Sequence, residues 1–175
     1  MNPQRIMIFG RPGSGKSTFA VKLAQALNLP IYHLDKLFFT HNWIERDHEE
    51  FLHLQAALVN QNKWIIDGNS LRSLEVRYER ADYVLCFMLP RWQCLWRIVK
   101  RRFGHKNPNI DDRAANCPEV LRFNLLQRTW TYDKRLEVRL SELGRLYSLN
   151  KVIFIQSDAD KNKLFEQLMQ KQRLH

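Results

Sequence analysis

The chain has 175 residues and carries 28 Lys and Arg against 18 Asp and Glu, a formal net charge of +10. This length predicts one domain, over residues 1–175, that is large enough to bury a core. No apolar run is long enough to cross a membrane, and the first expected strand leaves no room for a signal peptide. The three cysteines lack metal-type spacing, which favours a reducing, cytoplasmic compartment. The positive charge predicts attraction to polyanions, and the scatter of the basic residues favours a solvated surface with an anion site over a dedicated nucleic-acid groove.

The first expected elements surround a glycine-rich turn. Residues 5–9 form a short apolar run typical of a strand, and residues 16–27 carry apolar side chains at helical spacing. Between them, residues 10–18 read Gly-Arg-Pro-Gly-Ser-Gly-Lys-Ser-Thr, which contains the P-loop pattern G-x-x-x-x-G-K-[ST]. A junction of strand and helix is the context in which this pattern binds phosphate.

The turn predicts a site for the phosphates of ATP. Glycines let several backbone N–H groups converge, and the first turn of the helix adds more N–H donors. Lys16 would bring positive charge to the β- and γ-phosphates, which also makes it a catalytic candidate, and the Ser17 hydroxyl would bind Mg²⁺. The alternative is a glycine-rich turn that binds nothing. The expected cofactor-binding residues here are Gly10, Pro12, Gly13, Ser14, Gly15, Lys16, Ser17 and Thr18.

The next expected elements end in two acidic residues. A strand over 31–34 leads to Asp35, and a helix over 47–61 precedes a buried strand that ends at Asp67. Asp67 is expected to hold Mg²⁺, the alternative being the first residue of an Asp-Gly turn. Asp35 would accept a proton from an acceptor hydroxyl, or else cap the next segment. His33 is interpreted as structural.

The second half of the chain continues the alternation of strands and helices. It predicts a strand over 83–89, a helix over 92–103 and a lid-like loop at about 104–118. A long helix, whole or broken, follows as far as residue 143, then a strand over 152–155 and a helix over 161–174. This order predicts an α/β fold with a mainly parallel sheet covered by helices on both faces. Ligands then bind beyond the carboxyl ends of the strands, where the P-loop, Asp35, Asp67 and Ser157 would lie. The apolar face of the 92–103 helix is expected to run through Trp92, Leu95, Trp96, Val99 and Phe103.

Arginines are concentrated near these elements. Arg97 and Arg101 lie four residues apart on one helix and share a face, so they are candidates for stabilising the charge of a transferred phosphoryl group. Arg72, five residues beyond Asp67, and Arg113, in the lid-like loop, are expected to contact the nucleotide. Arg91 and Arg102 are further candidates. Any one of these arginines could instead be an ordinary surface residue.

Several of these segments together resemble a known family. Residues 10–18, Leu34-Asp35-Lys36, Ile66-Asp67-Gly68-Asn69 and Leu89-Pro90-Arg91-Trp92 are similar to the adenylate-kinase-related proteins called DNA topology modulation protein FlaR. The resemblance implies the P-loop fold of nucleoside and nucleotide kinases, with five parallel strands in the order 2-3-1-4-5. The chain departs from true adenylate kinases after Gly68, where their Phe-Pro-Arg segment is replaced by Asn69-Ser70-Leu71-Arg72, and in its short lid.

Two functions are compatible with this sequence. The first is an ATP-dependent phosphotransferase, adenylate-kinase-like, that moves the γ-phosphoryl group of Mg-ATP to a small acceptor such as a nucleoside or nucleotide. The second is a nucleotide-dependent DNA-binding protein that modulates DNA topology, supported by the net charge of +10 and the family's name. A GTPase switch is disfavoured, since Asn150-Lys151-Val152-Ile153 lacks the acidic residue of the guanine-binding pattern.

Overall fold

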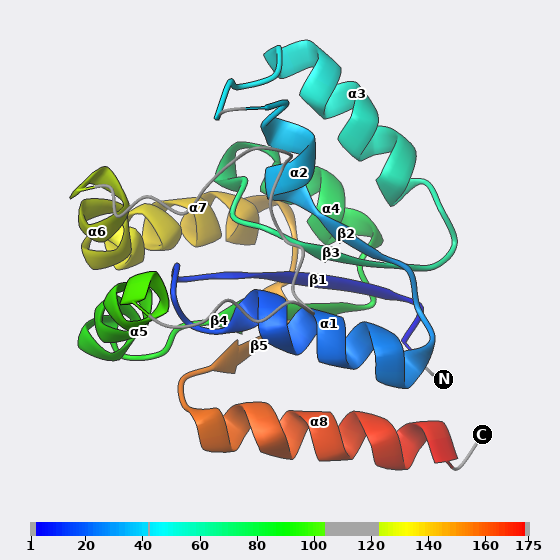
Figure 1. Cartoon of the computed structure of the whole chain (residues 1–175). Helices are drawn as coiled ribbons and strands as arrows, with labels where there is room; N and C mark the ends of the chain where they lie inside the picture. The colour runs from blue at the N-terminus through cyan, green and yellow to red at the C-terminus, as the bar shows by residue number, and fades with distance from the viewer. Residues whose placement is uncertain (1–2, 42, 104–122, 174–175) are drawn as a thin grey trace.

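The computed structural model describes residues 3–41, 43–103 and 123–173, without the side chains of Arg72, Arg102, Phe123 and Arg173. Its described residues form one parallel sheet in the order β2-β3-β1-β4-β5 (Figure 1). Both the α/β class and the strand order implied by the family resemblance are therefore confirmed. The strands are β1 (Arg5–Gly10), β2 (Ile31–His33), β3 (Trp64–Asp67), β4 (Tyr83–Phe87) and β5 (Val152–Ile155).

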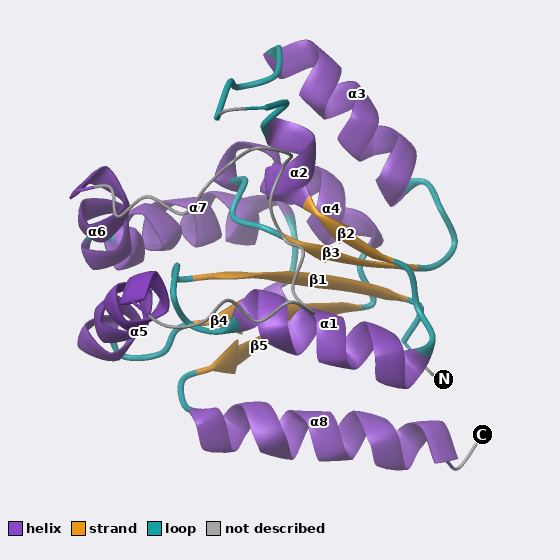
Figure 2. Cartoon of the chain, in the orientation of Figure 1, coloured by secondary structure: helices purple, strands orange, loops and turns teal. Residues whose placement is uncertain are grey.

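Helices cover both faces of the sheet (Figures 1 and 2). One core cluster joins α1 and α8 to one face of the sheet, and a second joins α3, α4 and α7 to the other face. In chain order the helices are α1 (Lys16–Leu27), α2 (Leu34–Phe38), α3 (His48–Val59), α4 (Leu74–Arg80), α5 (Arg91–Phe103), α6 (Phe123–Trp130), α7 (Tyr132–Leu146) and α8 (Asp158–Arg173), with short 3-10 turns η1 (Leu71–Ser73) and η2 (Leu149–Lys151).

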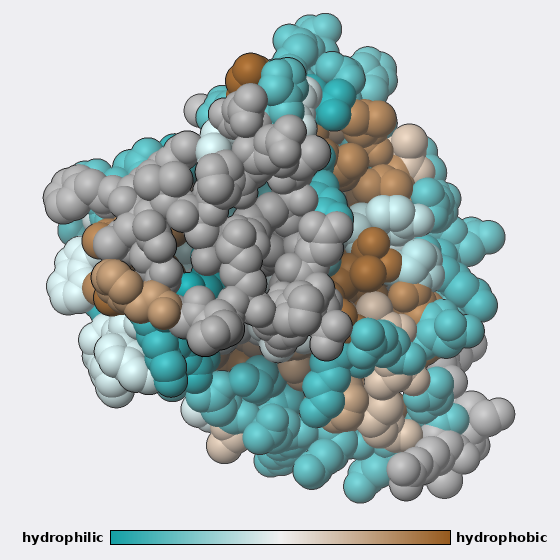
Figure 3. Space-filling model, viewed as in Figure 1, coloured by the Kyte–Doolittle hydropathy of each residue, from teal (hydrophilic) through white to brown (hydrophobic). Residues whose placement is uncertain are grey.

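The central strand shows why the strands of this sheet are apolar on both sides. Ile6 and Ile8 belong to the cluster under α1 and α8, whereas Met7 and Phe9 belong to the opposite cluster. Successive side chains of a strand point to opposite faces, so a strand covered on both faces needs apolar residues at every position. In the space-filling view, hydrophilic residues cover much of the visible surface and a hydrophobic patch lies over α3 (Figure 3).

Of the element boundaries that differ from the prediction, two follow from packing and capping. β2 ends at His33, and Leu34, expected in the strand, is instead the first residue of α2 and is buried. α8 begins at Asp158, three residues before the expected start at Lys161. Asp160 accepts hydrogen bonds from the backbone N–H groups of Gln156 and Ser157, while the Ser157 hydroxyl accepts one from the Asp160 N–H. This reciprocal capping box starts the helix early.

The apolar face predicted for the helix after β4 is wrong. Trp92, Trp96 and Phe103 are 70%, 58% and 82% exposed, while Cys94 and Ile98 face the interior. α5 lies at the rim of the molecule beyond the sheet, so only a narrow side of it can pack (Figure 1). The long helix is broken at Thr131 into α6 and α7. The expected lid at 104–118 lies outside the described residues.

Candidate active site

The P-loop joins the end of β1 to the start of α1, as predicted. Gly15 precedes Lys16, the first residue of α1, with a left-handed backbone at φ 84°. Gly13 also has a positive φ of 79°, and a Cβ placed there would lie 2.4 Å from the carbonyl oxygen of Cys94 on α5. Only glycine fits this close approach. At its N-terminus, α1 begins after Gly15 without a side-chain cap, and Lys16 and Ser17 lie in its first turn.

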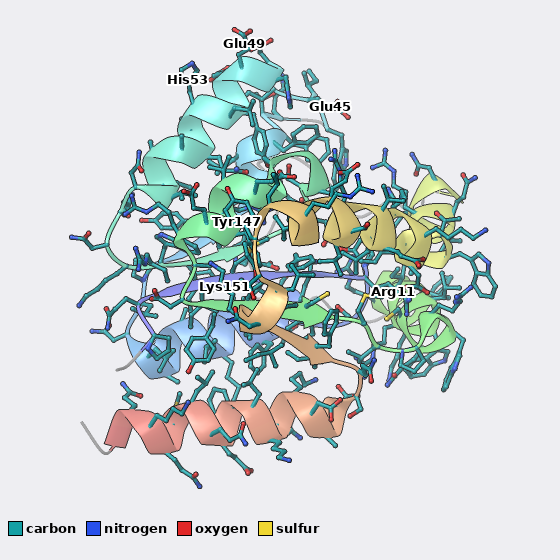
Figure 4. All side chains as sticks on the ribbon, turned by 180° about the vertical axis from the view of Figure 1, so that it is seen from behind. Arg11, Glu45, Glu49, His53, Tyr147 and Lys151 are labelled. Atoms are coloured by element: carbon teal, nitrogen blue, oxygen red, sulfur yellow. The ribbon has the colours of Figure 1, made fainter. Side chains whose placement is uncertain are left out.

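The beginning of the P-loop is tied to neighbouring strands and helices. The Gly10 N–H donates to Asn69 Oδ1 over 2.9 Å, and the Arg11 N–H donates to the carbonyl of Phe87 over 2.8 Å. The Arg11 side chain is buried and donates to the Leu89 carbonyl and to the Asp133 carboxylate at the start of α7. Figure 4 shows Arg11 at the end of the sheet, near α5 and α7. These bonds hold the loop from both sides.

Sequence reasoning missed the anchoring role of Arg11. The residue occupies a variable position of the P-loop pattern, and nothing in the pattern distinguishes a buried arginine there from an exposed one. Its carboxylate partner, Asp133, is also far away in the sequence, so no local pattern reveals the pair. Asp133 accepts a second hydrogen bond, from Arg91, over 3.0 Å. Asp133 thus connects the P-loop with α5 and α7.

Asp67 lies at the carboxyl end of β3, as predicted, and is 3% exposed. Its Oδ2 is 3.0 Å from Nδ1 of His33, the residue paired with it across β2 and β3. Burial raises the pKa of the Asp67 carboxyl, but the charge of Lys16, the hydrogen bond from His33 and the influence of the Ser17 hydroxyl outweigh it and bring the pKa below the ordinary 3.8. Asp67 is therefore a buried carboxylate that stays ionised beside the P-loop.

The second oxygen of this carboxylate makes Asp67 suitable for a cation. Asp67 Oδ1 is buried and has no hydrogen-bond partner among the described residues. A buried carboxylate oxygen is costly to leave unpaired, and Mg²⁺ prefers oxygen ligands of this kind. Lys16 and Ser17 act on the same carboxylate from the first turn of α1. Ser17 and Asp67 therefore fit a magnesium ion that would be completed by water and phosphate oxygens.

The loop after Asp67 is held by another buried arginine, Arg77 of α4. Its guanidinium donates to the carbonyls of Gly68 over 3.2 Å and Ser70 over 2.5 Å. Burial lowers the pKa of Arg77 to about 10, which leaves it charged at neutral pH. Sequence reasoning gave Arg77 no role, because helix α4 itself was not predicted. Gly68 has φ 151° and lies against Leu34, where a Cβ would come within 2.5 Å of the Leu34 Cβ.

The predicted arginines occupy different environments. Arg97 Nη1 donates to the carbonyl of Ser14 in the P-loop over 3.2 Å, and its Nη2 pairs with Asp158 at the start of α8. Arg91 pairs with Asp133 and lies 4.9 Å from the ring centre of Trp130. Arg101 is exposed on α5, one turn beyond Arg97. The side chains of Arg72 and Arg102, and the whole of Arg113, lie outside the described residues. Arg97 is thus the arginine of this set seen at the P-loop.

A cleft opens beside the P-loop between α1 and α8. It has a volume of about 370 Å³ and is lined by Gly15, Thr18, Phe19, Lys22, Arg97, Lys161, Asn162 and Phe165. Lys22 Nζ lies 4.1 Å from the centre of the Phe165 ring, so the cleft combines an aromatic ring with cations. Because Gly15 and Arg97 line it, the cleft is continuous with the P-loop.

Asp35 follows β2 but is not itself the end of the strand. It is the second residue of α2, its side chain is exposed, and its carbonyl accepts the N–H of Phe39 at the end of that helix. Since β2 and β3 are parallel neighbours, Asp35 still lies on the carboxyl side of the sheet, as do Asp67 and the P-loop.

Comparison with known proteins identifies the fold. The chain is similar to a shikimate kinase from Acinetobacter baumannii in complex with shikimate, with 18% identity, coverage of 95% of this chain and 91% of that one, and a TM-score of 0.59. It is also similar to a shikimate kinase from Bacteroides thetaiotaomicron (16% identity, 98% and 99% covered, TM-score 0.54). A gluconokinase from Sinorhizobium meliloti 1021 is a third neighbour (18% identity, 97% and 97% covered, TM-score 0.53).

These neighbours confirm a P-loop kinase-like fold over nearly the whole chain. No protein-family model matches the sequence, and no curated protein sequence matches it. The comparisons therefore support the broader resemblance to P-loop kinases and give no support to the narrower one to FlaR. No helix among the described ranges is long and apolar enough to cross a membrane.

Proposed function

We propose that the protein is an ATP-dependent phosphotransferase that moves the γ-phosphoryl group of Mg-ATP to a small acceptor. The observation that carries this proposal is that Lys16, in the first turn of the P-loop helix, acts on a buried, ionised Asp67 whose Oδ1 has no hydrogen-bond partner among the described residues. A glycine-rich turn without a ligand would not need a buried carboxylate aimed at the same helix N-terminus. Three small-molecule kinases with the same fold add support.

ATP would bind across the P-loop and the adjoining cleft. The backbone of residues 10–18 and Lys16 would bind the phosphates, and the cleft beside Gly15 and Thr18 would receive the base. Phe165 offers an aromatic ring there, and Arg97 reaches both the cleft and the P-loop. Lys22 and Lys161 add positive charge. Arg72 and Arg113 remain proposed contacts of the nucleotide.

Ser17 and Asp67 would hold the magnesium ion. When bound, Mg²⁺ neutralises part of the phosphate charge. The protein's own part is to hold Asp67 ionised and fixed, to place Lys16 at the phosphates, and to supply guanidinium donors from Arg97 and Arg101 to the equatorial oxygens of the transferred group. The hydrogen bond from Arg97 to the Ser14 carbonyl supports this proposed role, because it keeps the guanidinium beside the P-loop.

The acceptor would approach from the side of α2. We propose that Asp35 accepts the proton of the attacking hydroxyl, because its side chain is exposed on the carboxyl side of the sheet. A nucleoside or nucleotide is the proposed class, and small hydroxy acids and sugars belong in the same test, since the structural neighbours include shikimate kinases and a gluconokinase.

The test is a phosphorylation screen with purified protein and Mg-ATP. Each candidate nucleoside, nucleotide, hydroxy acid and sugar is incubated with γ-labelled ATP, and transfer of label to the acceptor is measured against release of free phosphate. Transfer of label to one class of acceptor supports the proposal if this transfer depends on Mg²⁺. A folded protein that neither binds Mg-ATP nor transfers label to any acceptor would contradict it. The alternative, a nucleotide-dependent effect on DNA topology, has only the net charge of +10 in its favour.

A further inference from the structure

His33 and Asp67 form a buried pair across the sheet. They are opposite one another in the parallel register of β2 and β3, and each is the last residue of its strand. His33 Nδ1 lies 3.0 Å from Asp67 Oδ2, and the two side chains are 8% and 4% exposed. Residues opposite each other in a sheet have side chains on the same face, so the register itself sets this contact.

The contact with His33 involves one oxygen of the Asp67 carboxylate and not the other. Oδ2 faces His33, whereas Oδ1 is buried and has no partner among the residues described. An aspartate has a single terminal torsion, which is soft in the absence of contacts. A hydrogen bond to one oxygen therefore decides where the other one points. The charge of Lys16 and the neutral hydroxyl of Ser17, both in the first turn of α1, also act on this carboxylate.

We propose that His33 is a positioning residue, which fixes the Asp67 carboxylate so that Oδ1 is presented to a divalent cation at the P-loop. This inference rests on the proposed function, because it assumes that Mg²⁺ accompanies the nucleotide. A carboxylate can only accept, so the Nδ1–H of the imidazole donates to Oδ2, and this hydrogen bond restrains the rotation of the carboxylate. Partners that orient a metal ligand in this way typically contribute about 10- to 100-fold to metal affinity.

A set of three substitutions separates this role from simple packing. In His33→Asn, the side-chain amide N–H lies near the position of Nδ1 and can keep the bond to Asp67, whereas in His33→Gln the amide lies near Nε2 and cannot. His33→Ala removes both. The measurement is the affinity for Mn²⁺, by electron paramagnetic resonance, in the presence of a non-hydrolysable ATP analogue. Thermal unfolding without metal shows that each variant is folded.

We expect His33→Asn to bind Mn²⁺ within about threefold of wild type, and His33→Gln and His33→Ala to bind it about 10- to 100-fold more weakly. Affinity for the metal-free analogue should change little in all three, since Asp67 would touch the nucleotide through the cation. Equal Mn²⁺ affinity in all four proteins would overturn the inference. So would a loss in His33→Asn as large as in His33→Gln, because the Nδ1 contact would then not be what matters.

The Asn and Gln variants carry the test even if His33→Ala does not fold, because they retain a polar side chain of similar size. Failure of the proposed function gives a different result. If wild-type protein binds neither the ATP analogue nor Mn²⁺ with it, the donor site itself is wrong. If wild-type protein binds both and only the three variants show no difference, the donor site stands and the role of His33 falls.

Discussion

Single charged residues define this site, and their partners determine what each can do. Lys16 is half-buried at the start of α1, and its charge is among the influences that keep Asp67 ionised. The Arg11 guanidinium donates hydrogen bonds to the Leu89 carbonyl and to Asp133, so its charge holds the loop in place. The Arg77 guanidinium donates its hydrogen bonds to the carbonyls of Gly68 and Ser70. Lys16 is thus the P-loop cation that we assign to the phosphates of ATP.

We expect Lys16→Ala to reduce ATP-dependent turnover by at least about a hundredfold, because a charge that meets the transferred phosphoryl group contributes several kcal/mol in a preorganised site. Turnover with the best acceptor and ATP affinity by calorimetry are measured together. Lys63→Ala, which removes an exposed lysine before β3, is the matched control. Wild-type affinity and turnover in folded Lys16→Ala would remove the donor site from this loop.

Asp35 is expected to act on the acceptor and not on ATP. Asp35→Asn should keep near-normal ATP affinity and lose acceptor phosphorylation by about a hundredfold, the usual contribution of a general base. An amide has nearly the same shape as the carboxylate but cannot take the proton. Glu137→Gln, on the exposed face of α7, is the control for loss of one negative charge. If turnover is unchanged in Asp35→Asn, the residue serves helix α2, and the acceptor must be sought near the loop after Asp67.

At the scale of elements, the sheet depends on contacts that tie the start of one strand to its neighbour. Asp82, directly before β4, accepts hydrogen bonds from the backbone N–H groups of Gln4 and Arg5, at 3.0 and 2.8 Å, and from Arg5 Nη2 at 2.8 Å. Lys151 of η2 donates to carbonyls at the end of α4, including that of Ala81 at 3.1 Å (Figure 4). Both contacts lie at the amino ends of the strands, away from the P-loop, so we expect them to affect the stability of the fold and not the candidate site.

Asp82 gives the stability a defined dependence on pH. Burial raises the pKa of its carboxyl, but the hydrogen bonds from Arg5 and Gln4 outweigh this and bring the pKa below 3.8. A carboxyl whose pKa is lower in the folded than in the unfolded protein stabilises the fold. This stabilisation is complete at a pH above the unfolded-state pKa, and it is lost as the pH falls through the folded-state pKa. We expect Asp82→Asn to lower the free energy of unfolding by about 1 kcal/mol at neutral pH.

Urea unfolding of wild type and Asp82→Asn across a pH series checks this expectation. The difference between the two proteins should be constant from neutral pH to about pH 5 and should shrink below the ordinary value of 3.8. Asp160→Asn, an exposed cap at the start of α8, serves as a comparison in a different element. A difference that grows on acidification would have the wrong sign and would exclude this assignment.

The elements that could be predicted from sequence are those whose signals are local. The P-loop strand and helix, β3 and β5 follow from apolar runs and glycine spacing, and α1 and β5 have the predicted bounds. α4 and the exposed face of α5 could not be predicted, because they depend on where the helix lies relative to the sheet. The contact of His33 with Asp67 joins residues 34 positions apart and depends on the register of two strands, which no local pattern shows.

At the scale of the whole molecule, the net charge of +10 is the feature that the proposed enzyme does not fully use. A phosphate-binding site explains a few of the cations, whereas others lie on exposed positions such as Lys100 and Lys134. A surface of this kind attracts any polyanion without recognising its sequence. The alternative function therefore predicts something stronger than attraction, namely DNA binding that depends on the nucleotide.

We expect DNA binding by this protein to be weak, sensitive to salt and indifferent to ATP. Counterion release makes the logarithm of the binding constant fall linearly with the logarithm of salt concentration, with a slope of about −0.9 for each phosphate neutralised. A fluorescent duplex is titrated at two salt concentrations, with and without Mg-ATP, using wild-type protein and Lys16→Ala. Under the kinase proposal the affinity should drop at least tenfold between about 50 and 200 mM salt, and Mg-ATP and Lys16→Ala should leave it nearly unchanged. A DNA affinity that survives the higher salt and changes with Mg-ATP in wild type but not in Lys16→Ala would instead favour a nucleotide-dependent action on DNA.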